Sequence, residues 1–369
     1  MTLIFYMIID FLAILFFKVA EVGRRKVEKN NIVHTKGKIY TYNFCLFFVF
    51  IILSLILGLR HYSVGVDTDN YRKVFFRIID GTITVSDKKW IPFGFLILNK
   101  VVGAFFGKNY VILNCIIGFL SIFFLLKSIW NNSDKPTLSL YIFIAMCLYY
   151  QMMNQARQML ALVIVMYSYK YLKERNFIKY AIFIGFASLM HSSAIIMLPF
   201  YFIANFKVNN KFLLLYLITT IAIILSYDYI VLLISKTSYG LIYSQTGYFQ
   251  AKDSSKLNLI IRLLMLFGVL IFKKKLLKEN PESKFLYNLV IWCTLFQIIT
   301  IKVYILGRIT SYFFVFYIFL IPKIIHSFPV KKRIYISALV VILFFIYHLV
   351  YFKYSSVTAG YDVYKLFML

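Results

Sequence analysis

Acidic residues are scarce in this chain. Its 369 residues include 14 Asp and Glu against 41 Lys and Arg, and 15% of all residues are charged. Soluble domains carry about 25% charged and about 45–50% apolar residues. Here 62% are hydrophobic, which excludes a soluble protein. A net charge of +27 would suggest nucleic acid binding in a soluble chain. In a membrane chain, basic loop residues instead set the orientation, so we expect no nucleic acid partner.

Cysteine is scarce as well. The four Cys residues lie within apolar stretches, and no CxxC or CxxH pair occurs. Such residues behave as small hydrophobic side chains, so we expect neither a disulfide framework nor a zinc site. We expect no other metal and no cofactor. The N-terminal segment lacks a basic region and a small-x-small cleavage site, which favours an uncleaved first span.

Continuous apolar runs are abundant, and they indicate spanning helices rather than the alternating ~10-residue segments of a β-barrel. The runs lie near residues 2–18, 39–58, 109–128, 137–151, 157–172, 179–205, 212–227, 257–272, 285–301, 309–324 and 334–351. A weaker run, 92–106, contains Gly94, Lys100 and Gly103. No linker divides the chain, so we expect one all-α, polytopic transmembrane domain over residues 1–369.

Basic loops predict the orientation. Lys and Arg concentrate in residues 18–38, 170–179, 273–284 and 323–333, which should face the cytoplasm. These loops share one side only if 92–106 does not cross fully and 179–205 crosses in and out. As one helix, 179–205 would measure ~40 Å, which is long for one crossing of ~30 Å and short for two. We therefore predict two half-helices that meet near His191, and about 12 crossings in total, some broken or re-entrant.

This topology places the polar motifs on the extracytoplasmic side. Two loops are expected there, residues 59–108 with a re-entrant segment and residues 228–256. The densest polar cluster, residues 58–71, contains Arg60, Asp67, Asp69 and Tyr71. It is not a calcium loop, because the Gly and Glu of an EF-hand are absent at loop positions 6 and 12. The alternatives are a solvated turn and a substrate-facing loop whose carboxylates accept sugar hydroxyls or act as a base.

A second motif, QMMNQARQ (151–158), opens an apolar helix. Asn154, Arg157 and Gln158 stand at positions i, i+3 and i+4, so a continuous helix would place them on one face. The planar guanidinium of Arg matches phosphate oxygens, and the two amides suit hydroxyl groups. The alternative is an interfacial helix start with a snorkelling Arg.

Three further polar positions interrupt apolar runs. His191 begins an HSS triplet and is either a structural histidine or a general base. Arg308 and Tyr312 stand at i and i+4 between two apolar runs, and Arg262 begins another run. Each Arg is either a snorkelling helix end or part of a site.

Four arginines are thus expected outside, where the positive-inside rule predicts few: Arg60, Arg157, Arg262 and Arg308. An Arg deep in a span costs roughly 2.5–3.5 kcal/mol on insertion scales. A cluster of them needs an anionic partner, and a lipid-linked pyrophosphate at the membrane surface is a natural one.

In combination, these motifs resemble the EpsG family. The resemblance rests on Arg60 with VGVDTDNY (64–71), NQARQ (154–158), ASLMHSSA (187–194) and RITSY (308–312), in this order across residues 60–325. It implies a Wzy-like polymerase with a GT-C-like helical bundle in the bacterial cytoplasmic membrane. The implied substrate is an oligosaccharide repeat unit on undecaprenyl pyrophosphate, polymerised into exopolysaccharide or capsule. Membrane lipid, a chain-length regulator and a flippase of the same pathway would be its partners.

The expected reaction is metal-independent glycosyl transfer on the extracytoplasmic side. The four outer arginines would bind the pyrophosphate. The general base would be one of His191, Asp67 and Asp69. The sugars would contact Tyr71, Asn154, Gln158 and Tyr312. The alternatives are a flippase or transporter of lipid-linked oligosaccharide, an acyltransferase that uses His191 and Asp69, and a scaffold without a ligand.

Overall fold

The structure is a computed structural model that describes residues 2–30, 36–84, 91–206, 210–235, 253–300 and 307–367. In these ranges the regular structure is helical, apart from one antiparallel bridge between Arg60 and Leu366. The expected all-α class is confirmed. Parts of the two expected extracytoplasmic loops, residues 85–90 and 236–252, lie outside the described residues.

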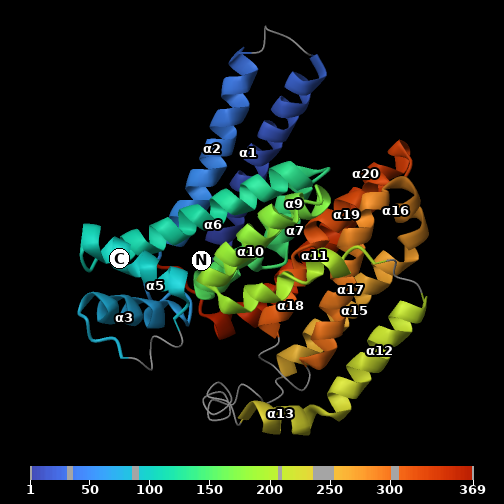
Figure 1. The fold of residues 1–369 in the computed structure, drawn as a ribbon. Helices are drawn as coiled ribbons and strands as arrows, with labels where there is room; N and C mark the ends of the chain where they lie inside the picture. Colours follow the sequence, from blue (N-terminus) through green and yellow to red (C-terminus); the bar gives the residue numbers. More distant parts are fainter. Residues whose placement is uncertain are drawn as a thin grey trace.

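Figure 1 shows the helices in the order in which they follow one another along the chain. The first half contains α1 (Thr2–Asn30), α2 (Lys36–Gly58), α3 (Thr68–Ile79), α5 (Phe93–Phe106), α6 (Tyr110–Asn132), α7 (Pro136–Ala145), α8 (Leu148–Asn154), α9 (Ala156–Lys173) and α10 (Phe177–Met190). The second half contains η2 (Ser192–Met197), α11 (Phe200–Ile203), α12 (Asn210–Leu225), α13 (Tyr227–Ser235), α15 (Asp253–Ile271), α16 (Lys273–Glu279), η3 (Pro281–Ser283), α17 (Lys284–Ile299), α18 (Gly307–Phe314), α19 (Tyr317–His326) and α20 (Val330–Ala359).

Several of these helices are long and apolar enough to span a membrane. Among the described residues five stretches qualify, namely Thr2–Lys26, Thr41–Gly58, Tyr110–Asn132, Gly307–His326 and Val330–Ala359. The pair α7 and α8, bent by 52° at its break, makes a sixth if it is one span. Shorter apolar helices include α5 and α10. The chain is therefore a polytopic membrane protein, and about 12 crossings would require the shorter helices to cross as well.

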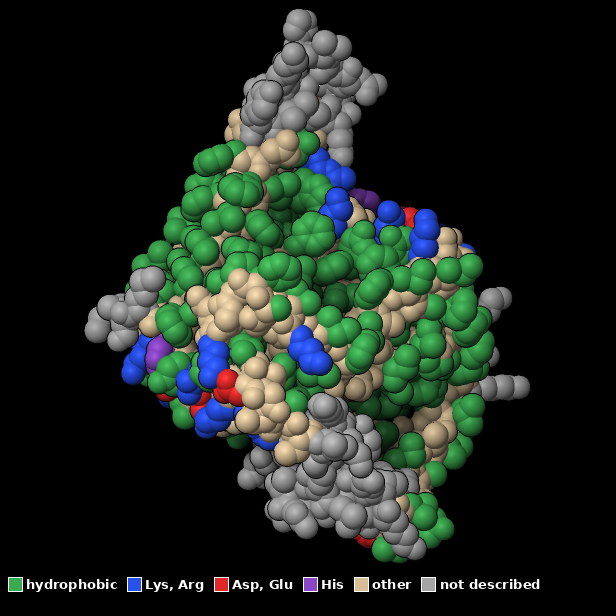
Figure 2. Space-filling model, turned by 60° about the vertical axis from the view of Figure 1, so that its left-hand side comes forward, with side chains coloured by type: hydrophobic (Ala, Val, Ile, Leu, Met, Phe, Trp, Pro, Cys, Tyr) green, Lys and Arg blue, Asp and Glu red, His purple; other side chains and the backbone are tan. Residues whose placement is uncertain are grey.

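The surface of the bundle matches this assignment. Large apolar side chains are exposed along its helices, for example Phe44 and Phe47 on α2 and Ile342 and Phe345 on α20. Figure 2 shows a broad apolar surface, with Lys and Arg side chains gathered mainly near its upper right and lower left. Apolar side chains can face lipid at no cost, whereas charged ones belong at the two polar boundaries.

Several of the basic loops meet at one end of the bundle. Lys323 forms an ion pair with Asp134 at 3.2 Å, and the Nη2 of Arg25 donates to the Asp134 carbonyl at 3.1 Å. The Nζ of Lys275 lies 4.0 Å from the centre of the Phe328 ring. These contacts bring three of the four basic segments together, as a common cytoplasmic side would require.

Two helix breaks shape the opposite end. His191 adopts extended backbone (φ −150°, ψ 111°) between α10 and η2, so the break expected near His191 is present. A second break at Gln155 separates α8 from α9, and the expected continuous helix through Asn154 and Arg157 is wrong. The reason is tertiary, because the Asn154 Oδ1 accepts the Asp67 N–H at 2.9 Å and fixes the end of α8 against the loop before α3.

Gly65 allows that close approach. It has φ +90°, and a Cβ atom built there would lie 2.2 Å from the Met153 carbonyl oxygen. The Thr68 hydroxyl donates to the same oxygen at 2.9 Å. Only glycine therefore lets the loop close against the end of α8.

Residues 360–367, which follow α20, lie along the loop of residues 59–66. The His61 N–H donates to the Lys365 carbonyl, and the Phe367 N–H donates to the Leu59 carbonyl, both at 2.8 Å. The Tyr364 hydroxyl donates to the Ile56 carbonyl at 3.0 Å. The C-terminal segment thus holds the loop that leads into α3.

Candidate functional site

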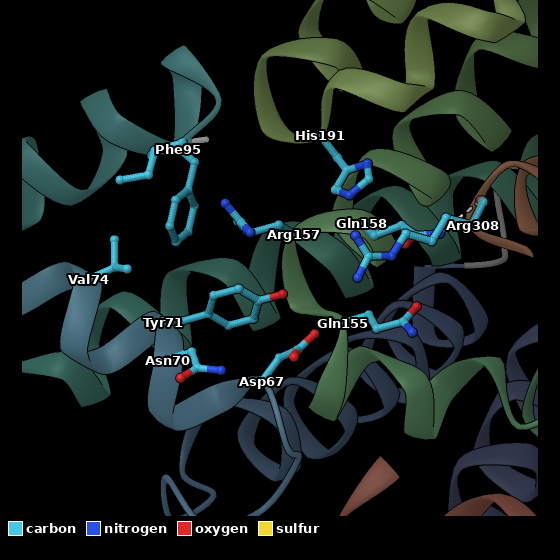
Figure 3. A pocket seen from close by; sticks show the side chains of 11 residues that line it. Asp67, Asn70, Tyr71, Val74, Phe95, Gln155, Arg157, Gln158, His191 and Arg308 are labelled. Atoms are coloured by element: carbon cyan, nitrogen blue, oxygen red, sulfur yellow. Dashed lines mark hydrogen bonds between the residues drawn. The ribbon is translucent and has the colours of Figure 1, made fainter. Parts of the chain in front are cut away.

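A pocket of about 240 Å³ collects side chains from five distant parts of the sequence (Figure 3). They come from the start of α3, from α5, from the α8–α9 break, and from His191 and Arg308. The residues that line it are Asp67, Asn70, Tyr71, Val74, Ile91, Phe95, Gln155, Arg157, Gln158, His191 and Arg308. Its polar members are cationic, amide, hydroxyl and carboxylate groups, which suits a ligand with both anionic and hydroxyl groups.

The structure brings together six of the eleven residues that the sequence indicated. Asp67, Tyr71, Arg157, Gln158, His191 and Arg308 line the pocket. Arg60, Arg262, Asp69, Asn154 and Tyr312 do not.

Arg157 lies at the centre of the pocket, with its guanidinium held against two aromatic rings. Its Cζ lies 4.9 Å from the centre of the Tyr71 ring and 5.1 Å from that of Phe95. Figure 3 shows the Arg157 side chain between these rings, with the Tyr71 hydroxyl directed toward the pocket. The buried Nε of Arg157 has no hydrogen-bond partner among the described residues. Aromatic contacts orient the guanidinium, and an unsatisfied buried donor favours an acceptor from a ligand.

Gln158 connects α9 to the start of α18. Its Nε2 donates to the Arg308 backbone carbonyl at 2.9 Å. This bond fixes the position of the Arg308 backbone near the start of α18. The Arg308 side chain extends from there to the pocket wall opposite Phe95 (Figure 3). Two guanidinium groups therefore face the same cavity from α9 and α18.

His191 is held from behind by a hydroxyl network. Its Nδ1 lies 2.7 Å from the Ser193 Oγ and 3.3 Å from the Tyr312 hydroxyl, and these two oxygens are 3.4 Å apart. Because Nδ1 is engaged, Nε2 is the ring nitrogen left for a ligand in the pocket. Tyr312 is fully buried, so it orients His191 rather than lining the cavity.

Asp67 is the carboxylate of the pocket. Burial raises the pKa of Asp67, and the positive charges of Arg308 and Arg157 offset part of that rise. Asp69 instead forms ion pairs with Lys73 at 2.7 Å and Arg72 at 2.6 Å on α3, and these partners lower its pKa. Of the two aspartates, only Asp67 is placed to contact a ligand in this pocket.

Arg60 and Arg262 are buried elsewhere. Arg60 donates through Nη1 to the Leu57 carbonyl beneath the C-terminal segment. The Arg262 Cζ lies 3.9 Å from the centre of the Phe314 ring, and its Nη1 lies 3.4 Å from the Cys293 Sγ. The expected group of four arginines is thus a pair in the pocket and two separate residues.

Three polar or aromatic residues of the pocket wall are outside the predicted set of site residues, although Asn70 and Gln155 belong to the motifs that the sequence indicated. Asn70 follows Asp67 by one helical turn, a spacing that could have identified it. Gln155 occupies the helix break, and Phe95 comes from the weak run 92–106. No local pattern pairs Phe95 with Arg157. Among the described residues, no group of three His, Cys, Asp or Glu side chains is placed to hold a metal ion.

Comparison with known proteins agrees with the motif pattern. The profile of the EpsG family matches residues 43–366, a range that includes every residue lining the pocket. No protein with a curated description matches the chain, and no solved structure does. Because the match covers most of its length, this chain belongs to the EpsG family.

Proposed function

We propose that this protein is a membrane glycosyltransferase of the bacterial cytoplasmic membrane. It joins oligosaccharide repeat units, carried on undecaprenyl pyrophosphate, into an exopolysaccharide, capsule or O-antigen-type polymer. Family membership supports the substrate class. The observation that carries the proposal is the convergence of Arg157, Arg308, His191 and Asp67 on one pocket.

The position of the pocket supports action on the outer face. In Figure 1, α3 and α5 lie at the end of the bundle away from α16 and the α19–α20 turn. The latter end carries the basic contacts of Lys323 and Lys275 and is cytoplasmic by the positive-inside rule. In the proposed topology, of GT-C type with about 12 crossings, the short helices α5 and α10 border the outer site.

The two arginines would act on the leaving group. A hydroxyl oxygen of the acceptor repeat forms a bond to the anomeric carbon of the donor. The bond from that carbon to the pyrophosphate oxygen breaks, and its electron pair leaves with undecaprenyl pyrophosphate. Arg157 and Arg308 stabilise this developing negative charge, because positioned cationic donors act most strongly where charge accumulates.

His191 is the proposed general base. The Nε2 of a neutral imidazole can accept the proton of the attacking hydroxyl, while Ser193 and Tyr312 hold Nδ1. Asp67 is the second candidate for this role, because its raised pKa brings the carboxylate closer to neutral pH. Asp69 is not retained, because it is paired on the surface of α3.

The size of the pocket limits how much substrate it encloses. A volume of about 240 Å³ corresponds to roughly eight water molecules at ~30 Å³ each. That is enough for a pyrophosphate and part of one sugar, so the remaining sugars would extend outside. Tyr71, Asn70 and Gln155 would contact the sugar next to the reacting bond.

A reconstituted assay tests the proposal. Purified protein is given labelled undecaprenyl-pyrophosphate repeat units in liposomes, and the products are separated by size. We expect a ladder of lengthening products, lost in Arg308→Ala while that variant still elutes as a folded protein. Transfer of the lipid between leaflets without lengthening would identify a flippase and refute the proposal.

A further inference from the structure

A second pocket, of about 260 Å³, lies where α16, η3 and α17 meet. It is at the end of the bundle that carries the basic loops, away from the pocket of Figure 3 (Figure 1). The side chains used below are Phe206, Lys273, Lys284, Tyr287 and Asn288. No Asp or Glu is among the residues that line it.

Two buried polar side chains of this pocket are incompletely satisfied. Tyr287 is 1% exposed, and its hydroxyl has no hydrogen-bond partner among the described residues. Asn288 is 2% exposed, and its Nδ2 donates to the carbonyls of Ala204 and Phe206, both at 2.8 Å. These bonds fix the amide and leave Oδ1 without a partner. A buried polar group without a partner is costly. Because both residues line the pocket, a ligand that enters between them can supply the missing acceptor and donor.

The charge of the pocket favours an anion. The Nζ of Lys273 lies 5.2 Å from the centre of the Tyr287 ring, and both residues line the pocket. Lys284 is the first residue of α17, where the helix dipole also favours negative charge. Two ammonium groups and a phenol hydroxyl form a set of donors that suits a phosphate group.

The surroundings favour a lipid over a soluble phosphate compound. Phe206 lines the pocket and is 47% exposed, and its ring lies 5.6 Å from that of Phe212 on α12. From there α12 displays large apolar side chains, including Leu214 and Leu217. Acyl chains can therefore lie along α12 while a headgroup enters the pocket.

We propose that this pocket binds an anionic glycerophospholipid whose headgroup carries a hydroxyl, of the phosphatidylglycerol class. The phosphate accepts from Lys273, Lys284 and Tyr287, and a headgroup hydroxyl donates to the Asn288 Oδ1. The site lies in the leaflet that contacts the basic loops. It stands independently of the reaction proposed for the other pocket.

Native mass spectrometry of delipidated protein tests the site. The protein is titrated with phosphatidylglycerol and, in parallel, with phosphatidylcholine of the same acyl composition. We expect at least one phosphatidylglycerol to bind about tenfold more tightly than phosphatidylcholine, and Tyr287→Phe or Lys284→Ala to reduce that preference. Losing one hydrogen bond to a charged group costs about 1.5–3 kcal/mol, or roughly 10- to 100-fold in affinity. Lys274→Ala, at an exposed position of α16 that does not line the pocket, is the matched control and should bind as the wild type does.

Three outcomes would overturn the proposal. Equal losses in Lys274→Ala and Lys284→Ala would mean that surface charge alone attracts the lipid. Unchanged preference in both Tyr287→Phe and Lys284→Ala would place the lipid elsewhere. Binding of sn-glycerol 3-phosphate in the same titration, without binding of the intact lipid, would identify a soluble phosphate ligand instead.

Discussion

Replacing Arg157 by lysine isolates the contribution of guanidinium geometry from that of charge. Lysine keeps the positive charge but removes the planar fork and the buried Nε donor. It also loses the flat surface that contacts the rings of Tyr71 and Phe95. If Arg157 stabilises a departing pyrophosphate, Arg157→Lys should fold normally and polymerise poorly.

The size of the effect follows from these contacts. One hydrogen bond to a charged group is worth about 1.5–3 kcal/mol, and a cation–π contact about 0.5–1 kcal/mol at an exposed site. A combined loss of about 2–4 kcal/mol in the transition state lowers the rate roughly 30- to 900-fold. Removal of a single oxyanion donor in other enzymes costs about 10²- to 10³-fold, which is the same range.

The assay measures the initial rate of polymer formation in liposomes, with Arg72→Lys as the matched control. Arg72 also lies against an aromatic ring, with its Cζ 4.1 Å from the centre of Tyr62, but it does not line the pocket. Its pairing with Asp69 is partly exposed and contributes little to stability. Equal rates for Arg157→Lys and the wild type would refute the argument from guanidinium geometry. Equal losses of rate in Arg157→Lys and Arg72→Lys would mean that replacing any such arginine lowers the rate, whether or not it lines the pocket.

The remaining predictions concern the two aspartates and the loop glycine. Asp67→Asn should lower polymer formation strongly and Asp69→Asn only slightly. Since burial raises the Asp67 pKa, any activity that needs its carboxylate is present above that pKa and lost as the pH falls through it. In the pH–activity profiles of the wild type and Asp69→Asn, activity should thus be lost on the acid side at a pH above about 3.9, the ordinary pKa of aspartate. Identical pH–activity profiles for Asp67→Asn and the wild type would contradict this prediction. Gly65→Ala should lower the unfolding temperature and the polymerisation rate, because its Cβ would meet the Met153 carbonyl oxygen and strained backbone costs about 1–3 kcal/mol. Gly81→Ala shares a positive φ but meets no atom within 4 Å, so a loss as large as that of Gly65→Ala would show that the contact with Met153 is unimportant.

Much of the pocket was predictable because its polar residues are conspicuous in an apolar chain. A polar side chain within an apolar run is costly unless it has a partner or a task, so Arg157, His191 and Arg308 were identifiable one by one. The break at His191 was predictable from length alone, because 27 residues fit neither one crossing nor two. The predicted topology puts these motifs on one side of the membrane, and Arg157, His191 and Arg308 line the same pocket.

The errors arose where distant contacts override local pattern. Helical spacing assigned Asn154 and Arg157 to one face. Instead α8 ends at Asn154, whose Oδ1 accepts the Asp67 N–H. Arg60 has the same residue type and the same expected side as Arg157, yet it is buried under the C-terminal segment. The sequence indicates that an arginine is unusual, but only packing determines which arginines share a cavity.

The hydrogen bonds between residues 360–367 and the loop of residues 59–66 have a consequence for biosynthesis. Tyr364 and its partner Ile56 are 308 positions apart, so the loop emerges from the ribosome long before the segment that pairs with it. During most of translation Asp67 lacks this support, and the cavity acquires its final form only after α20 has inserted. A newly made chain would therefore lack the finished cavity until its last residues have been made. Cleavage of the backbone near Gly360 would inactivate a folded molecule without altering any residue of the cavity.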